Sequence, residues 1–359
     1  MTDPVKSPSP PAAVSTSPPA ATTSPRSEST TSPTTQGPLV ADENPEEEDL
    51  GIEDNGASET TSLRSSILKY RVENGRTYHA YKDGSYVLPN DEAENERLDL
   101  QHTIFLLTWD GNLHVAPLQK EVHRVLDAGC GTGIWSVEFA DEHPEAQVTG
   151  IDLSPIQPSF VPPNCTFYVD DLEDDWTFST PFDFVFARFM TGSILNFPRF
   201  FKQSYDNLNS GGVIELQDII YPMCSDDGTL TEDTPLKRWS DLLNEAFRGN
   251  GRAMDTALFY KEQLADAGFV DIHTVEEKWP TNHWPRDPKY KQIGIWNQEN
   301  ILNALQALSL AIFTRPKEQG GLGWTAAELE LLLVGVRKDM KDRSIHGYWR
   351  IHAIYARKP

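Results

Sequence analysis

The residues best suited to chemistry lie in one short run, VLDAGCGTG, at residues 125–133. Gly129, Gly131 and Gly133 can take positive φ angles and leave bare backbone for a ligand to approach. The run joins an apolar stretch to an amphipathic one, which predicts a strand followed by the start of a helix. Free N–H groups at a helix N-terminus bind a carboxylate or a phosphate. Alone, such a glycine pattern also fits an ordinary tight turn.

Two acidic residues indicate which chemical groups the ligand carries. Asp127 precedes the glycines, where a carboxylate would attract an ammonium group, such as that of a methionine moiety, and oppose a pyrophosphate. Asp152 follows the next apolar stretch, 23 positions after Gly129, and can accept hydrogen bonds from both hydroxyls of a ribose. The alternative for Asp152 is a helix N-cap. Dinucleotide sites usually show G-x-G-x-x-G, and here the third glycine comes one residue early.

Three further residues follow later apolar stretches. Asp171 and Leu172 end the third stretch, where the adenine edge of a nucleoside would lie, and Arg188 ends the fourth. Ligands of open parallel sheets bind at the carboxyl ends of the strands, so all three are candidate binding residues. The alternatives are a polar loop for Asp171, because Asp is common in turns, and a surface ion pair for Arg188.

The elements that position these residues alternate between strand and helix from Val122 onward. Strands are predicted at HRVLDAG, AQVTGIDLS, CTFYVDDL, FDFVFARFM and VIELQDI, and helices at IWSVEFADEHP and FPRFFKQSYDNLNSGG. The second helix is expected to end at Gly211–Gly212. Strands separated by helices of this length form a parallel sheet with right-handed crossovers. VDIHTVEEKWP and YWRIHAIYARKP would then add a late pair of strands, one of them reversed.

The successive motifs resemble those of a known superfamily. VLDAGCGTG, GIDLS, DDLE, FDFVFAR and LNSGGVIEL look like the motifs of class I S-adenosylmethionine-dependent methyltransferases. YRVENGRTYHAYKDGSYVLPNDEAENERLDLQH, DLSPIQPSFVPPNCTF and FARFMTGSILNFPRF are similar to the fungal LaeA-like methyltransferases. The resemblance covers about residues 68–357, nearly all of the part of the chain that contains aromatic residues.

This resemblance implies an α/β fold with a Rossmann-like seven-stranded sheet whose last strand is antiparallel. It also implies the cofactor S-adenosyl-L-methionine. The implied cofactor contacts are Asp127, Gly129, Gly131, Gly133, Asp152 and Asp171, to which the strand-end argument adds Leu172 and Arg188. No spacing of Cys, His or acidic residues indicates a metal site.

The first part of the chain has the composition of a disordered tail. Residues 1–62 are rich in Pro, Ser, Thr and Ala, and no aromatic residue precedes Tyr70. Eleven acidic residues stand against Lys6 and Arg26 in the first sixty positions. Such a segment cannot bury enough apolar surface to offset the entropy of ordering it. We read it as a solvated linker, or alternatively as an acidic, phosphorylatable arm that binds protein partners, because Ser-Pro and Thr-Ser-Pro steps recur in it.

The rest of the chain is expected to form two regions. We expect residues 63–120 to form an N-terminal helical cap and residues 121–359 to form the methyltransferase domain. A lid-like insertion is expected at about 283–345, with helices around 297–314 and 325–341.

Charge and cysteine content exclude several classes of protein. The formal net charge of -23 opposes direct nucleic-acid binding, because the phosphate backbone is itself anionic. Cys130, Cys165 and Cys224 form no close pair, which fits an intracellular protein of cytoplasm or nucleus better than a secreted one. No apolar run approaches the length of about 18 residues that spans a membrane, and no signal peptide is evident.

The sequence does not single out a general base. Methyl transfer from a sulfonium expels a neutral thioether, so a base is needed only when the acceptor arrives protonated. The candidate bases are four histidines: His79, His102, His114 and His283. A lone histidine more often has a structural role. His102 is the strongest of these weak candidates, because helical spacing places it beside Leu98 and Phe105.

Three functions compete at this stage. The first is methylation of a small, partly apolar acceptor of fungal secondary metabolism, which the aromatic-rich C-terminal half would accommodate. The second, implied by the LaeA resemblance, is a regulator of secondary metabolism that acts through nuclear protein complexes, with methylation secondary or absent. The third is a nicotinamide-dependent oxidoreductase, which the glycine spacing disfavours.

Overall fold

The computed structural model describes residues 70–73, 75–82, 88–118 and 121–359. The chain divides into two units, Met1–Asp54 and Asn55–Pro359. The predicted tail, residues 1–62, lies outside the described residues. None of the helices in the described ranges is long and apolar enough to cross a membrane.

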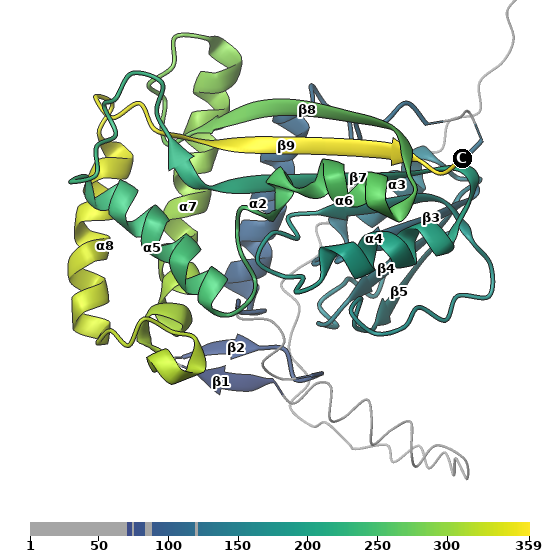
Figure 1. Ribbon diagram of the computed structural model, residues 1–359, viewed down its shortest axis with the longest axis horizontal. Helices are drawn as coiled ribbons and strands as arrows, with labels where there is room; N and C mark the ends of the chain where they lie inside the picture. The colour runs from purple at the N-terminus through teal and green to yellow at the C-terminus, as the bar shows by residue number, and fades with distance from the viewer. Residues whose placement is uncertain (1–69, 74, 83–87, 119–120) are drawn as a thin grey trace, which may run out of the picture. The chain divides into compact units, whose positions relative to one another are not determined.

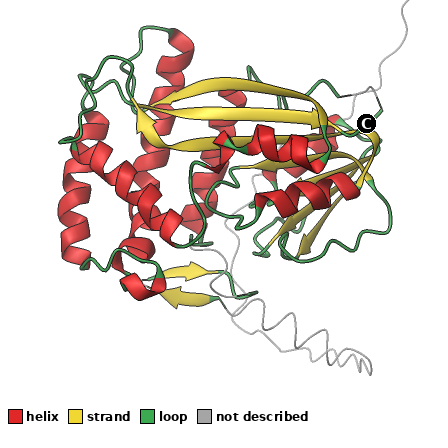
Figure 2. Cartoon of the chain, in the orientation of Figure 1, coloured by secondary structure: helices red, strands yellow, loops and turns green. Residues whose placement is uncertain are grey.

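A seven-stranded sheet runs through the second unit (Figures 1 and 2). Its order is β5-β4-β3-β6-β7-β9-β8. The strands are β3 (Arg124–Ala128), β4 (Gln147–Asp152), β5 (Cys165–Val169), β6 (Phe182–Arg188), β7 (Leu208–Cys224), β8 (Val270–Pro280) and β9 (Tyr348–Arg357). The pairs among β3 to β7 are parallel, whereas β9 is antiparallel to both of its neighbours. The predicted sheet with an antiparallel last strand is confirmed.

The strand order places a crevice where the candidate residues lie. From β3 the chain passes to β4 on one side, and it later passes to β6 on the other side of β3. In open α/β sheets, ligands bind outside the carboxyl ends of the strands at such a reversal. Asp127, Asp152 and Arg188 all lie at these ends, one on each of the three strands.

Side chains alternate between the two faces of the sheet because the strand period is two residues. Leu126 and Val185 face a core completed by α4 (Phe197–Asp206) and α6 (Tyr260–Ala267). Val125 and Phe184 face a second core completed by α3 (Ile134–Glu142). Both faces are therefore covered, as a parallel sheet requires.

Helices α2 (Glu92–Thr108), α5 (Pro235–Gly249), α7 (Pro288–Thr314) and α8 (Ala326–Lys341) form a third core with the far halves of β7 and β9. In Figure 1, α5, α7 and α8 lie together at one end of the long strands β7 to β9. The remaining elements are a hairpin of β1 (Arg71–Glu73) and β2 (Arg76–Tyr78) and two short turns of 3₁₀ helix, Thr256–Leu258 and Lys317–Gln319. The predicted insertion thus contains two helices, and α7 begins about nine residues earlier than expected.

A second helix boundary, the end of α4, was also predicted wrongly. Helix α4 ends at Asp206, and Gly211–Gly212 lie inside β7. The Asn207 side chain donates a hydrogen bond to the carbonyl of Gln203 and so closes the last turn early. Asp152 does not start a helix either; β4 runs into an irregular loop there.

Candidate active site

A cavity of about 160 Å³ opens at the carboxyl ends of β3, β4 and β6, with α2 along its rim. Seven of the eight predicted cofactor residues line it: Asp127, Gly129, Gly131, Asp152, Asp171, Leu172 and Arg188. Gly133 does not, although it belongs to the same turn. The sequence pattern and the tertiary structure therefore converge on one site.

The glycine turn is held close against its neighbours. The N–H groups of Gly129 and Cys130 both donate to the carbonyl of Ile151 at 2.9 Å. Gly129 has a φ of +82°, and a Cβ there would lie 2.4 Å from Met190 Sδ. Gly133, with a φ of +79°, caps α3, and a Cβ on it would meet the Phe167 ring at 2.5 Å. Gly129 thus allows close packing at the cavity, whereas Gly133 serves packing behind it.

Asp152 ties the glycine turn to the loop after β4. One carboxylate oxygen accepts from the Gly131 N–H at 2.9 Å, and the other accepts from the Ser154 N–H at 2.9 Å. Each carboxylate oxygen can accept more than one hydrogen bond, so acceptor capacity remains for a ligand. Burial raises the pKa of Asp152, and the two N–H donors oppose that shift.

Asp127 is a buried carboxylate that belongs to the lining of the cavity. Only 2% of the residue is exposed, and Ser136 on α3 donates to Oδ2 at 2.6 Å. Within the described ranges, Oδ1 accepts no hydrogen bond. Burial raises the pKa of Asp127 to about 6, which the Ser136 hydrogen bond and nearby Arg188 oppose. A cationic ligand group beside Oδ1 would offset this cost of burying the charge.

Arg188 is held by a chain of side chains from α2 and α3. Its Nη2 lies 2.8 Å from His102 Nδ1, and its guanidinium carbon lies 4.9 Å from the centre of the Phe105 ring. His102 Nε2 lies 2.8 Å from a carboxylate oxygen of Glu138. Burial and nearby Arg188 lower the pKa of His102 to about 3, so the imidazole is neutral. Burial also lowers the pKa of Arg188 to about 10, which leaves it charged at neutral pH.

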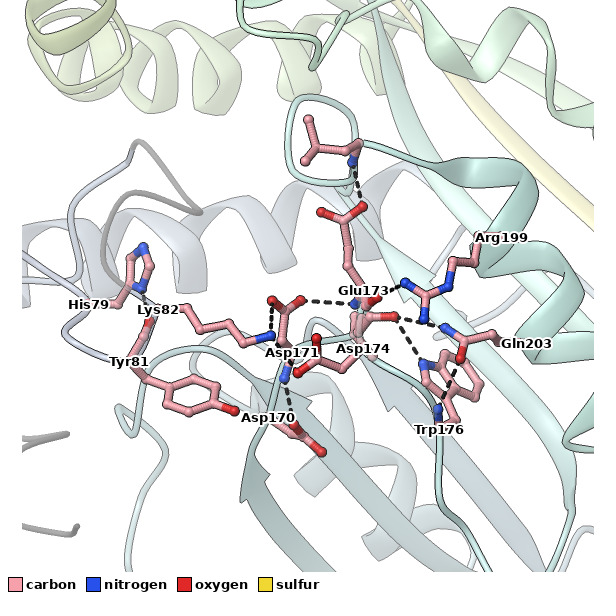
Figure 3. A network of polar contacts seen from close by, with 12 residues as sticks. His79, Tyr81, Lys82, Asp170, Asp171, Glu173, Asp174, Trp176, Arg199 and Gln203 are labelled. Atoms are coloured by element: carbon pink, nitrogen blue, oxygen red, sulfur yellow. Dashed lines mark hydrogen bonds and ion pairs between the residues drawn. The ribbon is translucent and has the colours of Figure 1, made fainter.

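Asp171 is shared between the cavity and a neighbouring polar network (Figure 3). Lys82 Nζ lies 2.9 Å from Asp171 Oδ2 and also bonds Asp174. The other oxygen of Asp171 accepts from the Glu173 N–H at 2.9 Å. Leu172, in contrast, packs into the core on the α4 face of the sheet. Both residues thus keep their place at the cavity, but Asp171 is already partly neutralised by Lys82.

Comparison with known proteins shows which family this chain belongs to. Residues 100–274 match the family described as "Methyltransferase domain". The chain is 40% identical over 303 residues to methyltransferase pytC of Aspergillus terreus, covering 84% of this chain and 92% of that protein. The chain belongs to the class I S-adenosylmethionine-dependent methyltransferases.

Two further fungal methyltransferases extend this result. The chain is 36% identical over 303 residues to the probable methyltransferase tdiE of Emericella nidulans, covering 83% of this chain and 92% of that protein. It is 33% identical over 305 residues to the protein-methionine methyltransferase laeA of the same fungus, covering 83% and 79%. The methyltransferase is therefore related to laeA, as its motifs suggested, and its identity to pytC and tdiE is higher than its identity to this laeA.

The residues of the cavity fit S-adenosylmethionine. The cofactor supplies a methyl group bound to a positively charged sulfur, and its amino-acid end carries an ammonium and a carboxylate. Asp127 presents an unpartnered oxygen to a cation, and Arg188 presents guanidinium N–H groups to an anion. Gly129, with its positive φ, belongs to the turn between β3 and α3 that lines the cavity. No group of three or more metal-binding side chains occurs in the part of the chain that the structure describes.

Of the four candidate bases, His102 alone lines the cavity. His79 and His114 hydrogen-bond through Nδ1 to the backbone carbonyls of Tyr81 and Ala116, and His283 lies elsewhere. Arg188 has no acceptor, so His102 Nδ1 must accept and Nε2 must carry the proton. The lone pair that a base would use is thus engaged by Arg188, and a base role for His102 stays a prediction.

Sequence reasoning missed three polar residues of α2 that line the cavity. Glu94 and Arg97 form a buried ion pair, and Arg97 also donates to Asn300 of α7 at 2.9 Å. Gln101 is 4% exposed, and its Nε2 has no partner among the described residues. The i, i+3 and i+7 spacing of these residues could have revealed a common helix face. No described residue of the predicted lid, 283–345, lines the cavity.

Proposed function

We propose that this methyltransferase acts on a small, partly apolar acceptor of fungal secondary metabolism. The observation that supports this best is the cavity lining beside Arg188, at the carboxyl end of β6. Phe189, Met190 and Ile194 follow the strand there, and Leu88 and Pro89 also belong to the lining. Such a mixture of apolar walls and a few polar groups is typical of small-molecule sites. The similarity to pytC and tdiE supports the same acceptor class.

In this proposal, different groups of the cofactor bind at the ends of different strands. Asp127 binds the ammonium group, and Arg188 binds the carboxylate. Asp152 accepts hydrogen bonds from the ribose, and Asp171 and Leu172 lie beside the adenine. The chain then accelerates transfer chiefly by holding the acceptor in line with the methyl group and by excluding water.

Isothermal titration with S-adenosylmethionine tests the binding part of the proposal. We expect wild-type protein to bind it and the variant with both Asp127→Ala and Asp152→Ala to bind far more weakly. The control is Asp183→Ala, because Asp183 bonds the backbone at the opposite end of the sheet. Unchanged affinity in the double variant would refute the residue assignment.

Incubation with methyl-labelled cofactor and fractionated metabolites tests the acceptor class. A labelled product of small size, absent with the Asp127→Ala/Asp152→Ala variant, is the expected result. Label found only in protein would instead support the second candidate function.

The second candidate is a regulator that acts through protein complexes, and the 33% identity to laeA favours it. In this second candidate function, the acidic tail is the proposed partner-binding arm, and the proposed location is the nucleus or the cytoplasm. Partners retained by a Gly131→Asp variant that no longer binds the cofactor would support this function. Loss of every partner with the same variant would count against it.

A further inference from the structure

We propose that His102 is a positioning residue whose Nδ1 fixes the Arg188 guanidinium so that Arg188 binds the carboxylate of S-adenosylmethionine. This inference rests on the proposed function, in which Asp127 binds the ammonium group of the same cofactor. It assigns His102 a role other than the general base that its place in the sequence suggested.

The proton positions follow from donor and acceptor chemistry. A guanidinium has only donors, so its contact with His102 at 2.8 Å requires the lone pair of Nδ1. The second ring nitrogen must then carry the proton, and it faces Glu138 Oε2 at 2.8 Å. His102 is 2% exposed, and Glu138 is 41% exposed. The Glu138 carboxylate thus selects the tautomer of the buried His102 ring. In functional histidines, the hydrogen bond made by one ring nitrogen often fixes the protonation of the other.

Arg188 has donors left over after this contact. Its guanidinium lies over the Phe105 ring, a contact that restrains the group without using any N–H. Among the described residues, His102 provides its one hydrogen bond, and no carboxylate lies within ion-pair distance of it. Arg188 lines the cavity together with Asp127. A charged group with unused N–H donors in a cavity is well placed to bind a ligand carboxylate.

The arrangement also separates the two charges that the cofactor must meet. Asp127 lies at the end of β3 and Arg188 at the end of the adjacent β6. Without His102, the guanidinium would lose the contact that fixes it, so the ligand carboxylate would lose its partner while Asp127 would keep its charge. The contact with His102 holds the guanidinium on the α2 side, so both charges stay available to a zwitterionic ligand.

Two isosteric variants separate the two ring nitrogens. His102→Asn keeps an oxygen acceptor near the position of Nδ1 but loses the group that faces Glu138. His102→Gln keeps a donor near the position of Nε2 but loses the acceptor for Arg188. The control is His352→Gln, which changes a buried histidine of β9 that does not line the cavity.

Each full-length variant is titrated with S-adenosylmethionine and with decarboxylated S-adenosylmethionine, which keeps the ammonium group. We expect His102→Gln to weaken S-adenosylmethionine binding by about tenfold or more, as expected for loss of one charge-assisted contact. The same variant should bind the decarboxylated ligand as wild type does. His102→Asn and His352→Gln should keep the wild-type preference for the ligand that carries the carboxylate. Circular dichroism melting confirms that each variant is folded.

Three outcomes overturn the inference. Equal weakening of both ligands by His102→Gln would show a merely structural role. Equal ligand affinities of the His102→Asn and His102→Gln variants would show that the acceptor at the Nδ1 position does not determine binding of the carboxylate. A wild-type protein that does not distinguish the two ligands would show that Arg188 does not bind the carboxylate. Failure of wild-type protein to bind either ligand would overturn the proposed function itself, which separates the two failures.

Discussion

Acidification should weaken S-adenosylmethionine binding through Asp127, while Arg188 and His102 keep their charge states. Its pKa is raised to about 6 because the carboxyl group is buried, whereas the pKa of Arg188 is about 10 and that of His102 is about 3. Between pH 5 and 8, Arg188 therefore stays charged and His102 stays neutral. Protonated Asp127 has no negative charge with which to bind the ammonium group, so affinity falls with its ionised fraction.

The size of this effect follows from the pKa. At pH 8 nearly all Asp127 is ionised, and at pH 5 about one tenth of it is, because each pH unit below the pKa changes the ratio tenfold. The dissociation constant for S-adenosylmethionine should thus rise about tenfold from pH 8 to pH 5. Isothermal titration in a series of buffers measures it.

A matched variant assigns the pH dependence to one side chain. Asp127→Asn keeps an acceptor for Ser136 but cannot ionise, so its binding should be weak and nearly independent of pH. The analogue 5′-methylthioadenosine, which lacks the ammonium group, should bind wild type without this dependence. A flat wild-type profile down to pH 5, or the same slope in Asp127→Asn, would refute the reasoning.

Three further predictions concern the turn and the sheet. Gly129→Ala should lower the free energy of unfolding measured by urea denaturation, because an alanine at this positive φ costs about 1–2 kcal/mol and its Cβ would clash with Met190. Adding Met190→Ala should relieve the clash but leave the backbone strain. Asp152→Ala should weaken both S-adenosylmethionine and 5′-methylthioadenosine in titration, because both contain the ribose; a loss confined to the former would contradict its assignment. Glu215→Gln should destabilise the fold by about 1–3 kcal/mol without changing cofactor affinity, because a buried NH₂ would replace one of the two carboxylate oxygens, both of which now accept from N–H donors of Val115, Ala116 or Gln217. An unchanged urea midpoint would contradict this.

Helix ends were harder to predict than strands. The strands β3 and β6 are short, mostly apolar segments whose carboxyl ends carry Asp127 and Arg188, so the pattern is local. The end of α4 depends instead on hydrogen bonds from Asn207 and on pairing of Gly211 with the chain end at Lys358. A partner about 147 residues away in the sequence leaves no local signal.

The roles of single side chains likewise depended on distant partners. Lys82 reaches Asp171 across 89 positions, and Arg97 reaches Asn300 across 203. Gln101 could be recognised as an unpartnered amide only once the cavity around it was known. Gly133 looked like a cofactor contact in the motif, yet its neighbour in space is Phe167.

The sequence by itself determined the parallel strands and the position of the glycine turn, because periodicity and the spacing of acids and glycines are local properties of the chain. The reversed last strand was implied by the resemblance of the chain's motifs to those of the superfamily. The tertiary structure alone decided the tautomer of His102. That tautomer requires Arg188 from β6 and Glu138 from α3 on opposite sides of one ring. Hydrogen bonds between buried side chains depend on which elements meet in space, and a linear pattern does not encode that meeting.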